Sequence, residues 1–154
     1  MRNCPLSTNE ERSESRMFGL SSKYYDVIYS FKDYKREAEL IRNYIAKHVL
    51  NCRTILDVAC GTGQYAFYLK NQYLIDGIDL NPEFISIAKR KNPEGNFYVA
   101  DMTNFTLNKK YDVVMCLFSS IGYVQTLDNV VRTLGCFKEH LNDNGIILVE
   151  PWFT

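Results

Sequence analysis

The sequence predicts an α/β fold, an open doubly wound sheet of parallel strands with helices on both faces. Short apolar segments of strand length alternate with amphipathic helical segments from residue 33 to residue 150, which is the pattern of parallel α/β sheets. The segment 111–118 is apolar almost throughout, as in a strand that helices cover on both faces. In such sheets, ligands bind at the carboxyl ends of the strands, near the point where the strand order reverses.

The first half of the predicted domain holds two helices and two strands. A helix is expected from about Asp33 to Leu50, because apolar side chains recur there at steps of three and four residues. A buried strand over Thr54–Ala59 ends at two glycines, Gly61 and Gly63. A short helix over Gln64–Lys70 follows, and then a strand over Leu74–Leu80.

The second half continues the alternation. A helix begins at Asn81-Pro82, because asparagine caps free amide donors and proline suits the first helical position. Strands are expected over Phe97–Ala100 and Tyr111–Phe118. A helix over Leu127–Leu141 is predicted to end at the polar residues 142–145, and a fifth strand runs from Gly145 to Glu150.

Composition limits the classes of partner. Lys plus Arg and Asp plus Glu number 18 each, so no net charge attracts the chain to nucleic acid or to a membrane surface. Residues 1–16 are polar and read as a disordered tail without a secretory signal, and residues 17–154 read as one domain. The five cysteines include no CxxC pair, so we expect no metal site and a cytoplasmic protein.

The turn after the first strand carries the strongest functional signal. Its sequence, Asp57-Val58-Ala59-Cys60-Gly61-Thr62-Gly63-Gln64, joins a strand to a helix, which is the context of a nucleotide-binding glycine loop. Glycine lets the backbone turn sharply and approach a ligand that a Cβ atom would block. Two glycines at a strand-to-helix turn could also serve the turn alone.

Acidic residues end the next two strands. Asp79 lies about 20 residues past the start of the glycine turn, where a carboxylate can accept both hydroxyls of an adenosine ribose. Asp101 follows the third strand and could accept from an adenine amino group, with Leu80 and Met102 on the two faces of the ring. Each acid alone could be an ordinary polar residue at a strand end, but three such features at neighbouring strand ends favour a ligand site.

The pattern Gly61-x-Gly63-x-x-Ala66 also fits the dinucleotide fingerprint of NAD-type oxidoreductases. Asp57 argues against that alternative, because a carboxylate next to the turn would repel a pyrophosphate. The same carboxylate suits the ammonium and sulfonium of S-adenosylmethionine, which carries no phosphate. We therefore expect S-adenosyl-L-methionine as the cofactor.

These motifs resemble the first three motifs of class I methyltransferases, which have a Rossmann-like sheet. A closer resemblance, from about Tyr24 onward, is to the N,N-dimethyltransferases of TDP-linked 3-amino sugars. The stretches that carry it are Tyr25-Asp26, Lys32-Asp33-Tyr34, residues 115–123 and residues 149–153, and its specific part is Phe118-Ser119-Ser120-Ile121-Gly122 and Glu150-Pro151-Trp152-Phe153. The resemblance implies N-methylation of a small molecule, by attack of a neutral amine on the sulfonium methyl without a metal.

The resemblance also implies roles for single residues. Tyr25 and the loop from Ala59 through Gly61 to Gly63 would hold the methionine part of the cofactor. Asp79 would hold the ribose, and Asp101 with Met102 and Leu80 would hold the adenine. Phe118 and Tyr123 would lie beside the transferable methyl. Tyr123 stands where some relatives have histidine, and since a free phenol loses its proton only near pH 10, we expect it to orient the amine rather than to deprotonate it.

The resemblance to this family also implies that the sheet should continue past Thr154, so we expect a domain that is incomplete at its C-terminus. An exposed fifth strand would favour self-association, for which a homodimer is one form. Two alternatives to amine methylation stay open. One is a methyltransferase for a carboxyl, hydroxyl or amino acid acceptor, and the other is a cofactor-binding fragment without catalysis.

Overall fold

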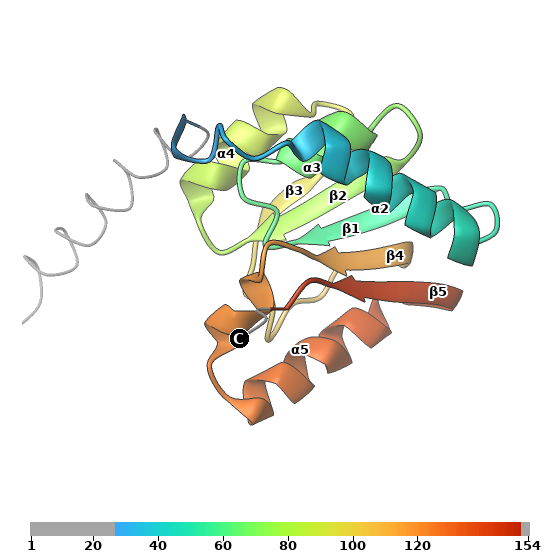
Figure 1. The fold of residues 1–154 in the computed structure, drawn as a ribbon. Coiled ribbons are helices and arrows are strands. Elements are labelled where there is room, and N and C mark those ends of the chain that lie inside the picture. Colours follow the sequence, from blue (N-terminus) through green and yellow to red (C-terminus); the bar gives the residue numbers. More distant parts are fainter. Residues whose placement is uncertain (1–26, 152–154) are drawn as a thin grey trace, which may run out of the picture. The chain divides into compact units, whose positions relative to one another are not determined.

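The structure is a computed structural model that describes residues 27–151. The chain divides into two units at residues 32 and 33. Of the first unit, the structure describes residues 27–32, where the rings of Tyr29 and Phe31 lie 6.0 Å apart. The sheet lies entirely in the second unit (Figure 1). The expected tail, Tyr25 and Trp152 lie outside the described residues.

The second unit is a five-stranded parallel sheet with the strand order β3-β2-β1-β4-β5. Its strands are β1 (Thr54–Val58), β2 (Leu74–Asp79), β3 (Phe97–Val99), β4 (Tyr111–Cys116) and β5 (Leu141–Val149). Its helices are α2 (Tyr34–His48), α3 (Gln64–Leu69), α4 (Pro82–Lys91), α5 (Leu127–Glu139) and the 3-10 helix η1 (Ser120–Val124). The predicted doubly wound parallel sheet is confirmed. The order reverses between β1 and β4, so a ligand site is expected at the carboxyl ends of these two strands.

Helices cover the two faces of the sheet unequally. Helices α2, α3 and α4 pack on one face, and α5 packs on the other (Figure 1). Alternate residues of β1 explain the division, because Ile55 faces the first layer and Leu56 faces the second. The predicted capping of α4 is also confirmed, since the Asn81 side chain accepts hydrogen bonds from the amides of Glu83 and Phe84.

Two aspartates, Asp76 and Asp112, connect the strands to neighbouring segments by accepting several hydrogen bonds each. Asp76 of β2 is buried and accepts hydrogen bonds from the Tyr111 hydroxyl, the Lys109 ammonium and the amide and side chain of Asn96. Burial acts to raise the pKa of Asp76, but these donors outweigh it and leave the pKa below its ordinary value. Asp112, at the start of β4, accepts hydrogen bonds from the amides of Arg53 and Thr54 and from the Asn142 side chain.

The segment 142–145 differs from the prediction. We expected these polar residues to stop α5 at Leu141 and to precede the fifth strand. Instead α5 ends at Glu139, and β5 already begins at Leu141. Tyr111 pairs with Leu141 and Val113 with Ile146, so residues 142–145 bulge out of the strand opposite Asp112 alone. The hydrogen bond from Asn142 to Asp112 and the left-handed backbone of Asn144 (φ +64°) accommodate the bulge.

No helix among residues 27–151 is long and apolar enough to cross a membrane. Within the same range, no three His, Cys, Asp or Glu side chains are grouped so that they could hold a metal ion. The cysteines at positions 52, 60, 116 and 136 are free thiols.

Gly63 is required by helix packing as well as by the turn. It caps the start of α3 in a left-handed conformation (φ +73°). A Cβ atom at this position would lie 2.6 Å from the Asn92 side-chain nitrogen and 3.1 Å from the Ala88 Cβ of α4. The Asn92 side chain donates a hydrogen bond to the Gly63 carbonyl at 3.1 Å, which fixes that close approach.

We therefore expect Gly63→Ala to lower the free energy of unfolding by at least about 1–2 kcal/mol, the cost of a left-handed L-residue. Gly135→Ala is the matched control, because nothing lies within 4 Å of a Cβ atom there. In the middle of α5, that change should raise stability by about 0.5–1 kcal/mol. Urea unfolding of the two variants measures both effects. Equal stabilities of Gly63→Ala and the parent chain would contradict the packing role.

Candidate functional site

The loop between β1 and α3 is held in a strongly bent conformation. Ala59, Gly61 and Gly63 all have positive φ, at 57°, 54° and 73°. For Ala59, which carries a Cβ atom, such a conformation costs about 1–2 kcal/mol. The Cys60 amide donates to the Ile78 carbonyl at 3.0 Å, so β2 supports the loop from the side. The loop lies at the carboxyl end of the central strand, where Ala59 and Gly61 are partly exposed and Thr62 and Gly63 are buried.

Asp79 joins this loop to the start of α4. Its Oδ2 accepts a hydrogen bond from the Gly61 amide at 2.8 Å, and its Oδ1 accepts one from the Asn81 amide at 2.8 Å. Burial raises the pKa of Asp79, against the opposing effect of these amide donors. Each carboxylate oxygen can accept a second hydrogen bond, so the expected contact with ribose hydroxyls remains available. The sequence did not reveal that the same carboxylate also shapes the glycine loop.

Asp57 is the unsatisfied group of the site. Only 2% of its surface is exposed, and its Oδ2 has no hydrogen-bond partner. Burial, and then the charge of Asp79, raise the pKa of Asp57 to about 8. A buried carboxylate without partners is costly when it is ionised. A ligand that brings positive charge to the glycine loop would remove that cost, and S-adenosylmethionine fits this condition.

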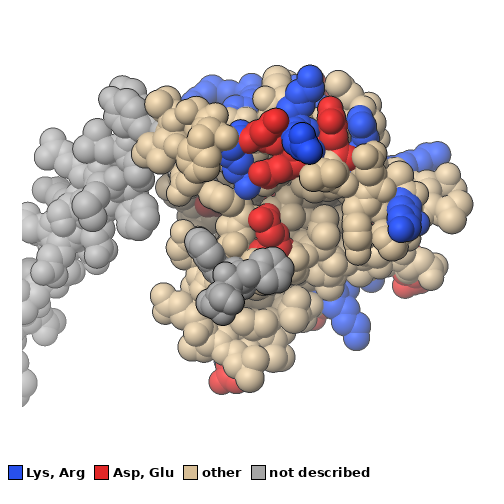
Figure 2. Space-filling view, viewed as in Figure 1, with Lys and Arg blue, Asp and Glu red and all other residues tan. Residues whose placement is uncertain are grey.

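Asp57 is one of three acids whose charges act on Tyr65. The Tyr65 hydroxyl of α3 donates to Glu37 of α2 at 2.6 Å. Burial, the hydrogen bond to Glu37 and then the charges of Glu37, Glu150 and Asp57 raise the Tyr65 pKa far above its ordinary value. Carboxylates from α2, from β1 and from the end of β5 therefore act on one phenol. In Figure 2, an acidic side chain also stands in the middle of the face, apart from the mixed charges at the top of the view.

The predicted adenine residues lie at the end of β3. The Ala100 amide donates to the Asp79 carbonyl at 3.0 Å, so the ends of β2 and β3 lie side by side. Asp101 is exposed, and its Oδ1 accepts from the amide and the hydroxyl of Thr103, both at 2.8 Å. Leu80 is 70% exposed, whereas Met102 packs partly against the apolar cluster under α5. The surface that Leu80 leaves open is suited to an apolar ring.

The segment after β4 forms the other wall of the site. Phe118 and Ser119 are both left-handed, with φ of 53° and 57°. The Phe118 amide donates to Glu150 Oε2 at 2.8 Å, and the Ser119 amide donates to the Glu150 carbonyl at 3.1 Å. Helix η1 follows directly, and its Tyr123 is 80% exposed.

The structure thus brings most of the predicted site residues to the carboxyl ends of β1, β2, β3 and β4. Those at these strand ends are Asp57, Ala59, Gly61, Gly63, Asp79, Leu80, Asp101, Met102, Phe118 and Tyr123. Tyr25 lies outside the described residues. Sequence reasoning missed Glu150, Glu37 and Tyr65 as neighbours of the site. Two signals were available for Glu150, its position at the end of the fifth strand and its place in the stretch 150–153 that carries the resemblance.

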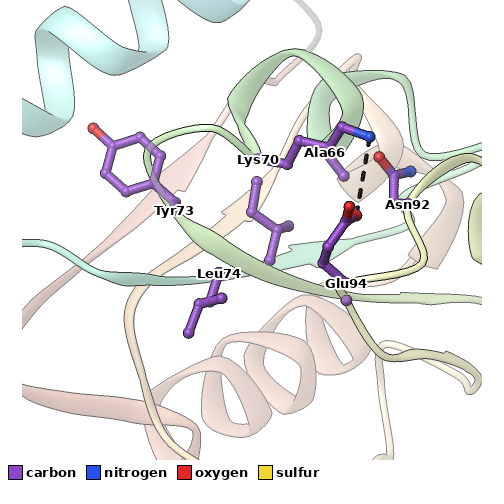
Figure 3. A pocket seen from close by; sticks show the side chains of 8 residues that line it. Ala66, Lys70, Tyr73, Leu74, Asn92 and Glu94 are labelled. Carbon is purple, nitrogen blue, oxygen red and sulfur yellow. Dashed lines mark ion pairs between the residues drawn. The ribbon is translucent and has the colours of Figure 1, made fainter.

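A small cavity lies elsewhere and does not compete with this site. Its volume is about 20 Å³, which is room for a single water molecule. It lies at the amino end of β2, where Tyr73 and Leu74 line it. The ion pair between Lys70 Nζ and Glu94 Oε2, 3.9 Å apart, flanks it (Figure 3). The carboxyl ends of the strands lie at the opposite edge of the sheet.

Comparison with known proteins agrees with this geometry. Residues 55–145 match the family described as the methyltransferase domain. The dTDP-3-amino-3,6-dideoxy-alpha-D-glucopyranose N,N-dimethyltransferase of Streptomyces fradiae is 33% identical over 138 residues, which are 88% of this chain and 54% of that protein. The dTDP-3-amino-3,4,6-trideoxy-alpha-D-glucopyranose N,N-dimethyltransferase of Streptomyces venezuelae is 32% identical over 84% of this chain and 56% of that protein. The chain therefore spans about half the length of these relatives.

Solved structures show the same fold. The crystal structure of Streptomyces venezuelae DesVI superimposes with a TM-score of 0.81 at 31% identity, over 86% of this chain and 57% of that one. CalS10 of Micromonospora echinaspora, an amino pentose methyltransferase solved with S-adenosylmethionine bound, gives 0.76 at 23% identity, over 99% and 60% of the two chains. With the family match covering more than half of its residues, the chain belongs to the class I S-adenosylmethionine-dependent methyltransferases.

Proposed function

We propose that this chain binds S-adenosylmethionine at the carboxyl ends of β1, β2 and β3 and takes part in methyl transfer to the amine of a small molecule. The observation that carries the proposal is the buried Asp57 carboxylate beside the glycine loop, with an oxygen that has no partner. A positively charged ligand group is the natural counterpart of that oxygen. S-adenosylmethionine would supply an electrophilic methyl group on a sulfonium.

Each residue of the site would contact a different part of the cofactor. Asp57 would compensate a positive charge of the methionine part, and the bent loop from Ala59 to Gly63 would let the backbone approach it. Tyr25 is proposed for the same part. Asp79 would accept from the ribose hydroxyls. Asp101, Leu80 and Met102 would hold the adenine, and Phe118 would stand beside the methyl group. A sulfonium is already a good leaving group, so the chain's residues mainly align the reactants and exclude water.

The charge of the site supports an amine as the acceptor. Asp57, Asp79 and Glu150 lie at the carboxyl ends of β1, β2 and β5, and like charges repel, so a carboxylate as the group that receives the methyl would be disfavoured there. The named activities of the two Streptomyces relatives, both dTDP-amino-sugar N,N-dimethyltransferases, point the same way. A nucleotide-linked amino sugar is therefore the acceptor that we propose. Exposed Tyr123 would orient the amine.

Other features of the protein remain predictions. The acceptor is expected to be a small molecule, with no nucleic acid or membrane partner. A cytoplasmic location and a homodimer are likewise expected from the sequence alone.

Cofactor binding should depend on pH through Asp57. The pKa of Asp57 is raised to about 8 without ligand, and a cationic ligand favours the ionised form, so binding should release a proton below pH 8. Affinity should then rise with pH, by up to about tenfold per unit between pH 5.5 and 7. Calorimetry in two buffers of different ionisation enthalpy measures the affinity and the proton count together.

Asp57→Asn should remove this pH dependence and weaken binding at pH 7.5 by about 1.5–3 kcal/mol. Asp143→Asn is the matched control, because Asp143 is an exposed acid in the bulge of β5, at the amino edge of the sheet. It should bind like the parent chain. An affinity for S-adenosylmethionine that stays flat from pH 5.5 to 7 would contradict the role of Asp57.

The acceptor is tested by competition between chemical classes. The protein is incubated with S-adenosylmethionine labelled in its methyl group and with a nucleotide-linked amino sugar, a free amino acid or a carboxylic acid. Mass spectrometry should show two successive methyl additions to the amino sugar and none to the acid, because the acids of the site repel a carboxylate. Methylation of the amino acid alone would point to an amino acid N-methyltransferase instead.

A further inference from the structure

Glu150 connects the end of β5 to the wall of the site that follows β4. Its backbone amide donates to the Cys116 carbonyl at 3.0 Å, and its carbonyl accepts from the Ser119 amide at 3.1 Å. Its side chain then turns back, so that Oε2 accepts from the Phe118 amide at 2.8 Å. One residue therefore takes three hydrogen bonds along the segment 116–119.

That segment has a conformation that its sequence does not favour. Phe118 and Ser119 are consecutive non-glycine residues with positive φ, and L-residues enter this region readily only when the surroundings fix them there. The Phe118 amide, at the start of this pair, donates a hydrogen bond to Glu150 Oε2 at 2.8 Å. A carboxylate oxygen is a strong acceptor for such an amide.

The charge of Glu150 also acts on Tyr65 of α3, the helix that follows the glycine loop, and the charge of Asp57 acts on the same phenol. Helix η1 begins at Ser120, directly after the left-handed pair, and carries Tyr123. The direction in which Tyr123 and Phe118 leave the sheet is therefore set at the turn that Glu150 holds.

We propose that Glu150 is a positioning residue for methyl transfer, which fixes the turn at Phe118 and Ser119 through the hydrogen bond to its Oε2. This inference rests on the proposed function. What matters in Glu150 is the length of its side chain, which brings an acceptor oxygen to the Phe118 amide. Its negative charge contributes less to this role.

Two conservative variants separate reach from charge. Glu150→Gln keeps an oxygen acceptor at the same distance and removes the charge. Glu150→Asp keeps the charge and withdraws the acceptor by about 1.5 Å, one carbon–carbon bond. Glu150→Ala removes both. Glu139→Ala, at the exposed end of α5, removes one acid away from the site and serves as the control.

The kcat with the amine acceptor should depend on whether the side chain at position 150 is long enough to accept from the Phe118 amide. Glu150→Gln should lower kcat by about threefold at most, and Glu150→Asp and Glu150→Ala by about 30-fold, as expected for loss of a hydrogen bond to a strong acceptor. The KM for S-adenosylmethionine and the midpoint of unfolding should stay close to those of Glu139→Ala. A Glu150→Asp enzyme more active than Glu150→Gln would overturn the proposal, and so would full activity of Glu150→Ala.

Hydrogen exchange of the Phe118 amide, measured with S-adenosylhomocysteine bound, tests the same contact without turnover. It should be at least about tenfold faster in Glu150→Ala and Glu150→Asp than in Glu150→Gln. Unchanged exchange in Glu150→Ala would overturn the positioning role. If the parent chain methylates none of the acceptors but the exchange rates follow this order, the proposed function fails and the role of Glu150 in the turn stands.

Discussion

The central strand β1 places the carboxylate of Asp57 in the interior of the sheet. Ionising a carboxylate there costs free energy, and this cost is the constraint on which the rest of the site depends. The fold is able to satisfy a buried carboxylate, because Asp76 in the neighbouring strand receives four donors and keeps a lowered pKa. Asp57 has an oxygen with no donor and a raised pKa. Both side chains are buried, so their pKa values differ in direction because the chain supplies hydrogen-bond donors to Asp76 and leaves an oxygen of Asp57 without one. The missing partner of Asp57 is one that a ligand can provide.

The two edges of the sheet therefore have different tasks. At the amino edge, Asp112 binds the amides of Arg53 and Thr54 and the side chain of Asn142, which ties the beginnings of β1, β4 and β5 together. At the carboxyl edge, the side chains of Asp79 and Glu150 instead accept hydrogen bonds from the amides of Gly61 and Phe118, which have left-handed backbones. The strain of Ala59, Phe118 and Ser119 is tolerated there because the packed sheet and the bonds to Ile78 and Glu150 fix their surroundings.

Local patterns in the sequence predicted the elements, and long-range contacts decided the rest. The alternation of strand and helix, the Asn81 cap and the placement of the glycine loop after β1 needed only neighbouring residues, and the structure confirms them. The segment 142–145 was wrongly predicted as a helix stop, because its partner Asp112 lies 30 residues earlier. The contact of Gly63 with Asn92 and that of Phe118 with Glu150 also join distant residues that no periodicity links. Helix η1 was missed for a similar reason, since its start depends on that turn.

The bulge of β5 has a practical consequence. Residues 142–145 leave the ladder opposite a single residue, and Asp143 and Asn144 at its tip are exposed. Beyond the bulge, β5 is in regular register with β4, since Val113 to Cys116 pair with Ile146 to Val149. A fluorescent reporter or a short affinity tag grafted between Asp143 and Asn144 would therefore lie at the opposite edge of the sheet from the glycine loop, away from the residues that we propose for ligand binding.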